Sequence, residues 1–229
     1  ILLEKSLSVL KDGIYEGRRI YGNIMKYMKM ALSGNFGNVF SVLVASIFLP
    51  FLPMIPIQML LQNLVYDFTQ IAIPWDNVDA EFMRKPKKWD TRGLSRFMNV
   101  LGPVSSVFDV ATFAVLWFVL GYRTAPMETF FQTGWFIEGL ISQTVIVHFI
   151  RTSKIPFLQS QADIRLVFSS FCGLLAALAL PAALHSVAGF HFALMPGVYY
   201  GWLAVILACY AAAIEIVKRI YIRKNGEWL

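Results

Sequence analysis

Four oxygen-bearing side chains interrupt two of the apolar stretches of this sequence. Asn35 and Asn38 are three residues apart, and Asn63 and Asp67 are four apart, so each pair shares one face of a helix. Amide and carboxylate oxygens are ligands that Mg²⁺ and Ca²⁺ prefer. A carboxylate in apolar surroundings favours its ionised form only beside a cation. The spacing therefore predicts a site for a hard cation or, at Asp67, for a proton. A hydrogen bond between helices is the structural alternative for Asn35 and Asn38.

Two further carboxyl groups, Asp109 and Glu138, lie in apolar stretches farther along the chain. Asp109 is expected midway along a span, either on an ion pathway or in a packing hydrogen bond to a polar neighbour such as Gln143. Glu138 is expected near the outer end of its span, as a cation ligand, a group that admits the ion, or an interfacial charge. Both are candidate functional residues because charged groups within membranes are costly and rarely incidental.

The elements that must position these residues are membrane helices. Of the 229 residues, 57% are hydrophobic and 15% charged, and the mean hydropathy is +0.59. A soluble domain has about 45–50% apolar and about 25% charged residues, so the composition indicates an all-α, polytopic membrane helical bundle. A helix needs about 20 mostly apolar residues to cross a bilayer. Six stretches fit, at about residues 30–49, 55–73, 100–122, 134–150, 166–187 and 199–221.

The basic residues predict the orientation of these spans. All but one of the 20 Lys and Arg residues lie before the first span, between the second and third, between the fourth and fifth, or after the sixth. Arg123 is the exception. Because cytoplasmic segments carry an excess of Lys and Arg, both termini are expected in the cytoplasm. This pattern explains the net charge of +6 without nucleic acid, for which no basic stretch has a reader motif.

The first 29 residues alternate charged and apolar residues at helical spacing, which predicts a cytosolic stalk helix that joins the first span. Gly13, Gly17 and Gly22 argue against an unbroken helix. The chain is thus divided into a stalk segment (1–29), the first two spans with the ion site (30–74), a basic cytosolic loop (75–99), and a four-helix supporting membrane domain with a short tail (100–229).

Two cysteines, Cys172 and Cys209, lie in apolar runs. Their spacing supports neither a zinc site nor a disulfide framework. They are expected to be small buried side chains.

Several segments, in this order, resemble the last six membrane helices of P-type ATPases. Residues 16–23 read EGRRIYGN and look like the start of the family's fifth helix, the stalk from the phosphorylation domain. Residues 33–38, SGNFGN, look like the ion-site stretch of that helix. Residues 56–67, PIQMLLQNLVYD, resemble the sixth helix, whose NLVxD carries the family's ion-binding carboxylate. Residues 135–138, WFIE, resemble the eighth helix, which supplies a glutamate in calcium pumps.

Two departures favour the magnesium-transporting branch of that family. Asn38 stands where the calcium pumps have a glutamate, and Phe68-Thr69-Gln70 stands where they continue with Gly-Leu-Pro. Fewer carboxylates imply one ion, and Mg²⁺ keeps several waters in an octahedral oxygen shell. The resemblance thus implies a metal site without catalytic residues in this chain, with Asp109 on a possible ion pathway. Its expected ligands are Asp67, Asn38, Asn35, Asn63 and Glu138.

The resemblance also implies the activity. The chain is expected to be the transmembrane, cation-binding portion of an ATP-hydrolysing translocase that imports Mg²⁺ through the bacterial inner membrane. The DKTGT phosphorylation motif, the nucleotide and actuator domains, the first four helices, and ATP with its own Mg²⁺ are expected outside this chain. The expected partners are membrane lipid, Mg²⁺ and the rest of the pump, and not nucleic acid. Alone, the chain is expected to be inactive.

Two other functions stay open at this point. A small secondary cation transporter or channel would use Asp67 and Asp109 as a relay, and an inverted repeat would support it. No such repeat is found between residues 1–115 and 116–229. A purely structural membrane protein would leave Asp67 without a role in transport.

Overall fold

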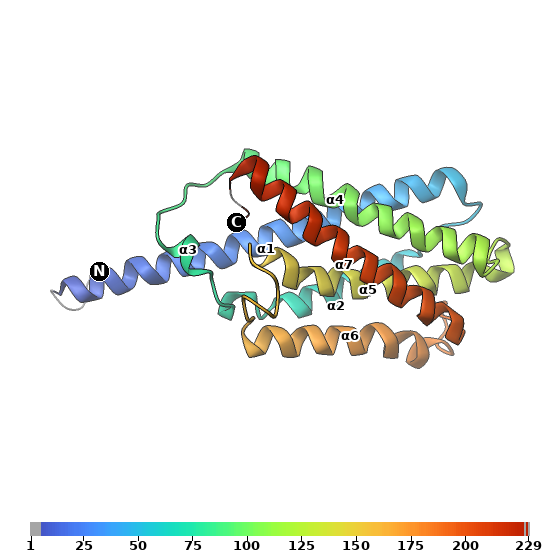
Figure 1. Cartoon of the computed structure of the whole chain (residues 1–229). Helices are drawn as coiled ribbons and strands as arrows, with labels where there is room; N and C mark the ends of the chain where they lie inside the picture. Colours follow the sequence, from blue (N-terminus) through green and yellow to red (C-terminus); the bar gives the residue numbers. More distant parts are fainter. Residues whose placement is uncertain (1–5, 227, 229) are drawn as a thin grey trace.

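The computed structural model describes residues 6–226 and 228, which form a bundle of helices (Figure 1). The α-helices are α1 (Leu7–Phe48), α2 (Pro56–Gln70), α3 (Ala80–Met83), α4 (Thr91–Ala114), α5 (Glu128–Ile150), α6 (Ile164–Leu184) and α7 (Gly197–Asn225). Three short helical turns join them: η1 (Ile73–Trp75), the π-helical η2 (Val115–Val119) and η3 (Ala125–Met127). The predicted all-α membrane bundle is confirmed.

Helix α1 is unbroken along its 42 residues, and its N-terminal part projects beyond the other helices (Figure 1). At 1.5 Å per residue it is ~60 Å long, about twice the hydrocarbon thickness of a bilayer. The stalk helix is thus continuous with the first span, although the glycines argued against an unbroken helix. Gly22 instead allows a close approach, because a Cβ there would lie 3.0 Å from Cγ1 of Val78 and 3.1 Å from Cε1 of Phe82. Residues 1–5 of the predicted stalk segment lie outside the described residues.

Helix α2 is shorter than the predicted second span. Among the described residues, five helices are long and apolar enough to cross a membrane, and α2, with 15 residues, is not one of them. Prolines limit it, since Pro56 opens the helix and Pro74 lies in the η1 turn that follows it. The segment still runs the length of the bundle. Gln58 in its first turn hydrogen-bonds the backbone between α6 and α7, and Pro74 meets Asn23 of α1.

Helix α5 is the centre of the bundle. It contacts α1, α2, α4, α6 and α7, and nearly every residue along it is buried. It begins at Glu128, six residues before the predicted start of this span, so Glu138 lies in the middle of the helix. The expectation that Glu138 is near the outer end is therefore wrong. The sequence placed the start of this span after the polar residues Gln132 and Thr133, because such residues are unfavourable in contact with lipid. In the structure both side chains are buried against protein, so the helix continues through them.

Small residues allow α1 and α4, the two helices with the most extensive mutual contact, to approach closely. The Ser106 hydroxyl donates to the Gly37 carbonyl at 2.9 Å, and Gly102 faces the ring of Phe36. Close approach through glycine and serine is typical of helix pairs in membranes. The α1–α4 pair thus fixes the membrane part of α1 against the bundle.

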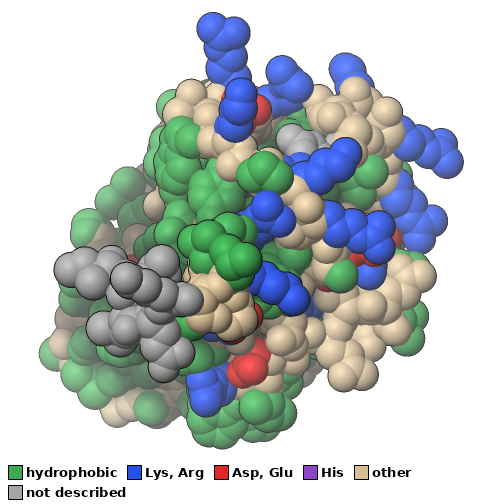
Figure 2. Space-filling view, turned by 90° about the vertical axis from the view of Figure 1, so that its left-hand side faces the viewer, with side chains coloured by type: hydrophobic (Ala, Val, Ile, Leu, Met, Phe, Trp, Pro, Cys, Tyr) green, Lys and Arg blue, Asp and Glu red, His purple; other side chains and the backbone are tan. Residues whose placement is uncertain are grey.

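Lysine and arginine side chains gather at one end of the bundle (Figure 2). The N-terminal end of α1, the connection around α3 and the C-terminus all lie at this end (Figure 1). The two cysteines differ from prediction: Cys172 on α6 and Cys209 on α7 are exposed rather than buried. They lie on the outer, apolar faces of helices that lipid covers in a membrane.

Candidate cation site

Most of the predicted ligands on α1 and α2 do not lie on the faces by which these helices pack. Helix α1 packs chiefly on α4, and α2 packs on α5 and α6. Asn35, Asn63 and Asp67 are exposed, while Asn38 is half-buried. Three of the four predicted ligands on α1 and α2 therefore lie on a side of the bundle that no described helix covers.

An open cavity of about 610 Å³ lies between the N-terminal half of α1 and the end of α2. Its wall is apolar except for a few groups, which include Asp67, Asn23 and Gln70. The Asp67 carboxylate is thus next to a space that apolar side chains enclose on the α1 and α2 sides. A carboxylate in such surroundings needs a cation, a proton or a polar partner.

Asp109 and Glu138 meet in the middle of the bundle. Their side chains are 4% and 1% exposed, and their carboxyl groups interact with each other. Asp109 also accepts hydrogen bonds from the Ser41 hydroxyl and, at 3.1 Å, from Nε1 of Trp135. Asp109 therefore makes packing hydrogen bonds, as one of the two interpretations expected, but its partners are Ser41 and Trp135 and not Gln143, the neighbour named as an example. Oε2 of Glu138 has no hydrogen-bond partner among the described residues.

Asn38 of α1 is hydrogen-bonded to α5. Nε2 of Gln143 donates to Oδ1 of Asn38 at 2.8 Å. Asn38 is one turn from Ser41, and Gln143 is about one and a half turns from Glu138. The Asn38–Gln143 bond joins α1 to α5, and the Asp109–Glu138 pair, which joins α4 to α5, lies about one turn farther along these helices.

The structure brings some predicted residues together and leaves others apart. Glu138 lies with Asp109, and Asn38 lies about one turn away. Asn35, Asn63 and Asp67 lie on the uncovered side. Among residues 6–226 and 228, no group of three or more His, Cys, Asp or Glu side chains could hold a metal ion. A cation site in this chain would thus depend on amide oxygens and on groups from outside the chain.

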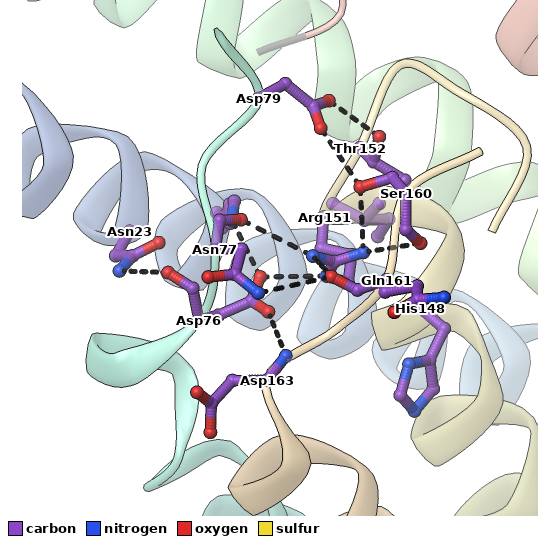
Figure 3. A network of polar contacts seen from close by, with 12 residues as sticks. Asn23, Asp76, Asn77, Asp79, His148, Arg151, Thr152, Ser160, Gln161 and Asp163 are labelled. Atoms are coloured by element: carbon purple, nitrogen blue, oxygen red, sulfur yellow. Dashed lines mark hydrogen bonds and ion pairs between the residues drawn. The ribbon is translucent and has the colours of Figure 1, made fainter. Parts of the chain in front are cut away.

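A second polar cluster, which sequence reasoning missed, lies at the basic end (Figure 3). Asp76, which follows η1, accepts from Nζ of Lys26 at 2.7 Å and from Nε of Arg151 at 2.8 Å, and all three side chains are buried. The backbone N–H of Asp163 also donates to Asp76. This cluster ties α1, the segment after α2, the end of α5 and the start of α6 to one carboxylate.

Opposing effects set the pKa of Asp76. Burial by itself raises the pKa, but the charge of Lys26 and the hydrogen bond and charge of Arg151 outweigh it, so the pKa lies below the usual value of 3.8. Asp76 is therefore ionised at neutral pH. Lys26, a charged residue next to Met25 on the apolar face of the stalk helix, is the one sequence signal for this cluster. The residues that pair in the cluster are 50 or more positions apart in sequence, so the pairs could not be inferred.

Comparison with known proteins identifies the family. The model of the family described as "Cation transporting ATPase, C-terminus" matches residues 51–220. The chain belongs to the cation-transporting ATPases. It is 47% identical over 229 residues to "Magnesium-transporting ATPase, P-type 1" of Salmonella typhimurium, which covers 100% of this chain and 25% of that protein. The protein of the same name in Escherichia coli K12 is 50% identical over 227 residues, 99% of this chain and 25% of that protein.

A calcium pump is a more distant relative of this cation-transporting ATPase chain. "Calcium-transporting ATPase" of Bacillus subtilis is 29% identical over 161 residues, 69% of this chain and 18% of that protein. The chain spans about a quarter of the length of the magnesium-transporting relatives it matches. The predicted resemblance to P-type ATPases is therefore confirmed.

Proposed function

We propose that this chain is the membrane-spanning, cation-binding part of a pump that imports Mg²⁺ into the cytosol, driven by ATP hydrolysis in domains outside the chain. Similarity along the whole chain to proteins named as magnesium-transporting ATPases supports this proposal. The observation that carries it is Asp67, a carboxylate set among amides on helices of a membrane bundle. A secondary transporter or channel, the earlier alternative, is not favoured, because the family is one of ATPases.

The uncovered side of α1 and α2 supports a shared site. An ionisable side chain at membrane depth faces protein or water rather than lipid. The relatives are about four times as long as this chain, so they have further segments that could cover Asn35, Asn63 and Asp67. We infer that Mg²⁺ binds between these residues and that covering segment, with Asn38 at the inner wall. Glu138, buried with Asp109, is proposed as a more distant acidic group of the same pathway.

The proposed ligands suit the chemistry of Mg²⁺. One carboxylate and several neutral amide oxygens leave coordination positions to water, which Mg²⁺ gives up reluctantly. Asp67 supplies the charge that favours a divalent ion, and the amides supply oxygen without further charge. The continuous α1 would transmit movements of the cytosolic domains to Asn35 and Asn38, because it is a single rigid element over both regions.

The basic end is proposed to face the cytosol of a bacterial inner membrane. Cytoplasmic segments are enriched in Lys and Arg, and these residues gather at the end where both termini lie (Figures 1 and 2). The proposed partners are membrane lipid, the transported Mg²⁺ and the remaining parts of the pump.

The proposed function is tested by Asp67→Asn in the full-length parent pump. The variant should lower Mg²⁺-stimulated ATPase activity by more than about 100-fold, since loss of groups that only support a metal ligand already costs about 10–100-fold. The matched control is Asp90→Asn, which removes the same charge from the exposed start of α4. If Asp67→Asn keeps the activity and the Mg²⁺ dependence of the control, the assignment of Asp67 is wrong.

A further inference from the structure

The side chain of Gln143 is polar, buried and only half satisfied. It is 5% exposed in the middle of the bundle. Its Nε2 donates to Oδ1 of Asn38 at 2.8 Å, while its Oε1 has no hydrogen-bond partner among the described residues. A buried carbonyl without a partner is costly, so such a group requires an explanation.

An unpartnered amide oxygen is not peculiar to Gln143, since Oε1 of Gln58 and both amide atoms of Gln70 on α2 also lack a partner among the described residues. What differs is the group to which the Gln143 amide donates. Gln132, on the same helix, donates to the carbonyl of Leu52, and Gln58 of α2 donates to the carbonyls of Phe190 and His191. Those bonds fix loops to the outer end of the bundle, which is a structural task. Gln143 instead bonds the side chain of Asn38, a proposed ligand, and no backbone group.

Further unpartnered oxygens lie on each of the two helices that the Asn38–Gln143 bond connects. Oγ of Ser33 on α1 and Oε2 of Glu138 on α5 are both buried without a partner. Each is five residues from its end of the Asn38–Gln143 bond, about one and a half helical turns. Helices α1 and α5 thus each carry, besides the bonded amides, a buried oxygen that described donors do not satisfy.

We propose that Gln143 is a positioning and specificity-determining residue of the cation site. This inference rests on the proposed function. The bond from Nε2 fixes the Asn38 carbonyl and leaves the second acceptor position of Oδ1 for the cation. The unpartnered Oε1 accepts a hydrogen bond from a water molecule that stays on the cation.

Gln143 in this role distinguishes Mg²⁺ from Ca²⁺. Mg²⁺ keeps several of its waters when proteins bind it, whereas Ca²⁺ takes six to eight oxygen ligands in flexible geometry. A neutral acceptor one water away from the ion therefore favours hydrated Mg²⁺. A carboxylate at that place would instead favour direct binding by adding charge. Gln143 thus adds selectivity without raising the charge of the site.

The test uses the full-length parent pump with Gln143→Leu, and with Gln132→Leu as the matched control on the same helix. Gln143→Leu should raise the KM for Mg²⁺ in the ATPase assay by about 10–100-fold, the usual effect of removing a group that orients a metal ligand. It should leave kcat within a few-fold of wild type and weaken the preference for Mg²⁺ over competing Ca²⁺. Gln132→Leu should change neither property. Gln143→Met, which keeps the side-chain length, replaces Gln143→Leu if that variant does not fold.

A double variant separates positioning from packing. If Gln143 acts through Asn38, then Gln143→Leu should add little to the KM already raised by Asn38→Ala, because residues that act as one unit are not additive. Equal KM values for Gln143→Leu and Gln132→Leu, or full additivity with Asn38→Ala, would overturn the inference. The proposed function fails separately, if Asp67→Asn leaves the Mg²⁺ dependence intact.

Discussion

Asp76 joins four segments of the chain through one buried carboxylate. Two positive charges, Lys26 and Arg151, are buried with it. Asn23 donates to its backbone carbonyl at 3.0 Å (Figure 3). Buried ion pairs gain little over apolar packing, but removal of one partner leaves an uncompensated charge. Asp76 is therefore the residue of this cluster whose loss should be felt most.

Asp76→Ala should destabilise the protein by about 3–5 kcal/mol, because Lys26 and Arg151 stay buried without a counter-charge. The thermal unfolding midpoint in detergent measures the effect. Asp79→Ala is the matched control, since among the described residues the Asp79 carboxylate accepts hydrogen bonds from the neutral hydroxyls of Thr152 and Ser160 in the same region. An equal loss in both variants would show that the charges of the cluster do not matter.

The pH dependence of stability follows from the lowered pKa of Asp76. A carboxylate whose folded-state pKa lies below its unfolded value stabilises the fold above that unfolded value, usually 3.8. This contribution is lost as the pH falls through the lower, folded-state pKa. Below pH about 4, wild-type stability should therefore fall more steeply than that of Asp76→Asn, which has no such proton to take up. Parallel pH profiles of the unfolding midpoint would contradict this assignment.

Candidate functional residues could be recognised from the sequence where a polar side chain interrupts an otherwise apolar helix. Asp67 and Asn63 stand out for that reason. Gln143 does not, because α5 is buried on all sides and its polar residues follow no single face. The partner of Asp76 is even harder to infer, since Arg151 lies 75 residues away and the ion pair depends on the packing of the whole end of the bundle.

At the scale of elements, the α1–α4 contact couples the stalk to the membrane domain. Gly102 faces the Phe36 ring so closely that a Cβ would collide with it. Gly102→Val should destabilise the protein by about 1–3 kcal/mol through overpacking. Gly201→Val on α7, where nothing lies within 4 Å, is the control. Similar unfolding midpoints for both variants in detergent would show that this contact is loose.

The ends of a helix could be predicted where they depend on the hydropathy of lipid-facing residues. They were harder to predict where they depend on contacts with other parts of the protein. The apolar part of α1, α6 and α7 follows from the hydropathy of their sequences. The length of α2 depends on prolines at both ends, and the start of α5 depends on burial of Gln132 and Thr133. Burial of polar residues by neighbours is a tertiary effect, so composition alone placed the start of α5 too late.

At the scale of the whole molecule, the distribution of charge gives the orientation proposed above. Thr124, beside the outlying Arg123, and Ser153, after Arg151, are both exposed at opposite ends of α5. In a background with Cys172→Ala and Cys209→Ala, a membrane-impermeant thiol reagent should label Thr124→Cys in spheroplasts. It should label Ser153→Cys only in inside-out vesicles. The reverse labelling pattern would contradict the orientation.

The central claim is that Asp67 binds Mg²⁺ that the intact pump imports into the cytosol. Its most direct test is Mg²⁺ transport by the full-length parent pump in sealed inside-out proteoliposomes, followed with a lumenal Mg²⁺ indicator. The account predicts ATP-dependent loss of lumenal Mg²⁺ in the wild type and in Asp90→Asn, and none in Asp67→Asn. ATP-driven accumulation of lumenal Mg²⁺, or transport that Asp67→Asn leaves unchanged, would contradict it.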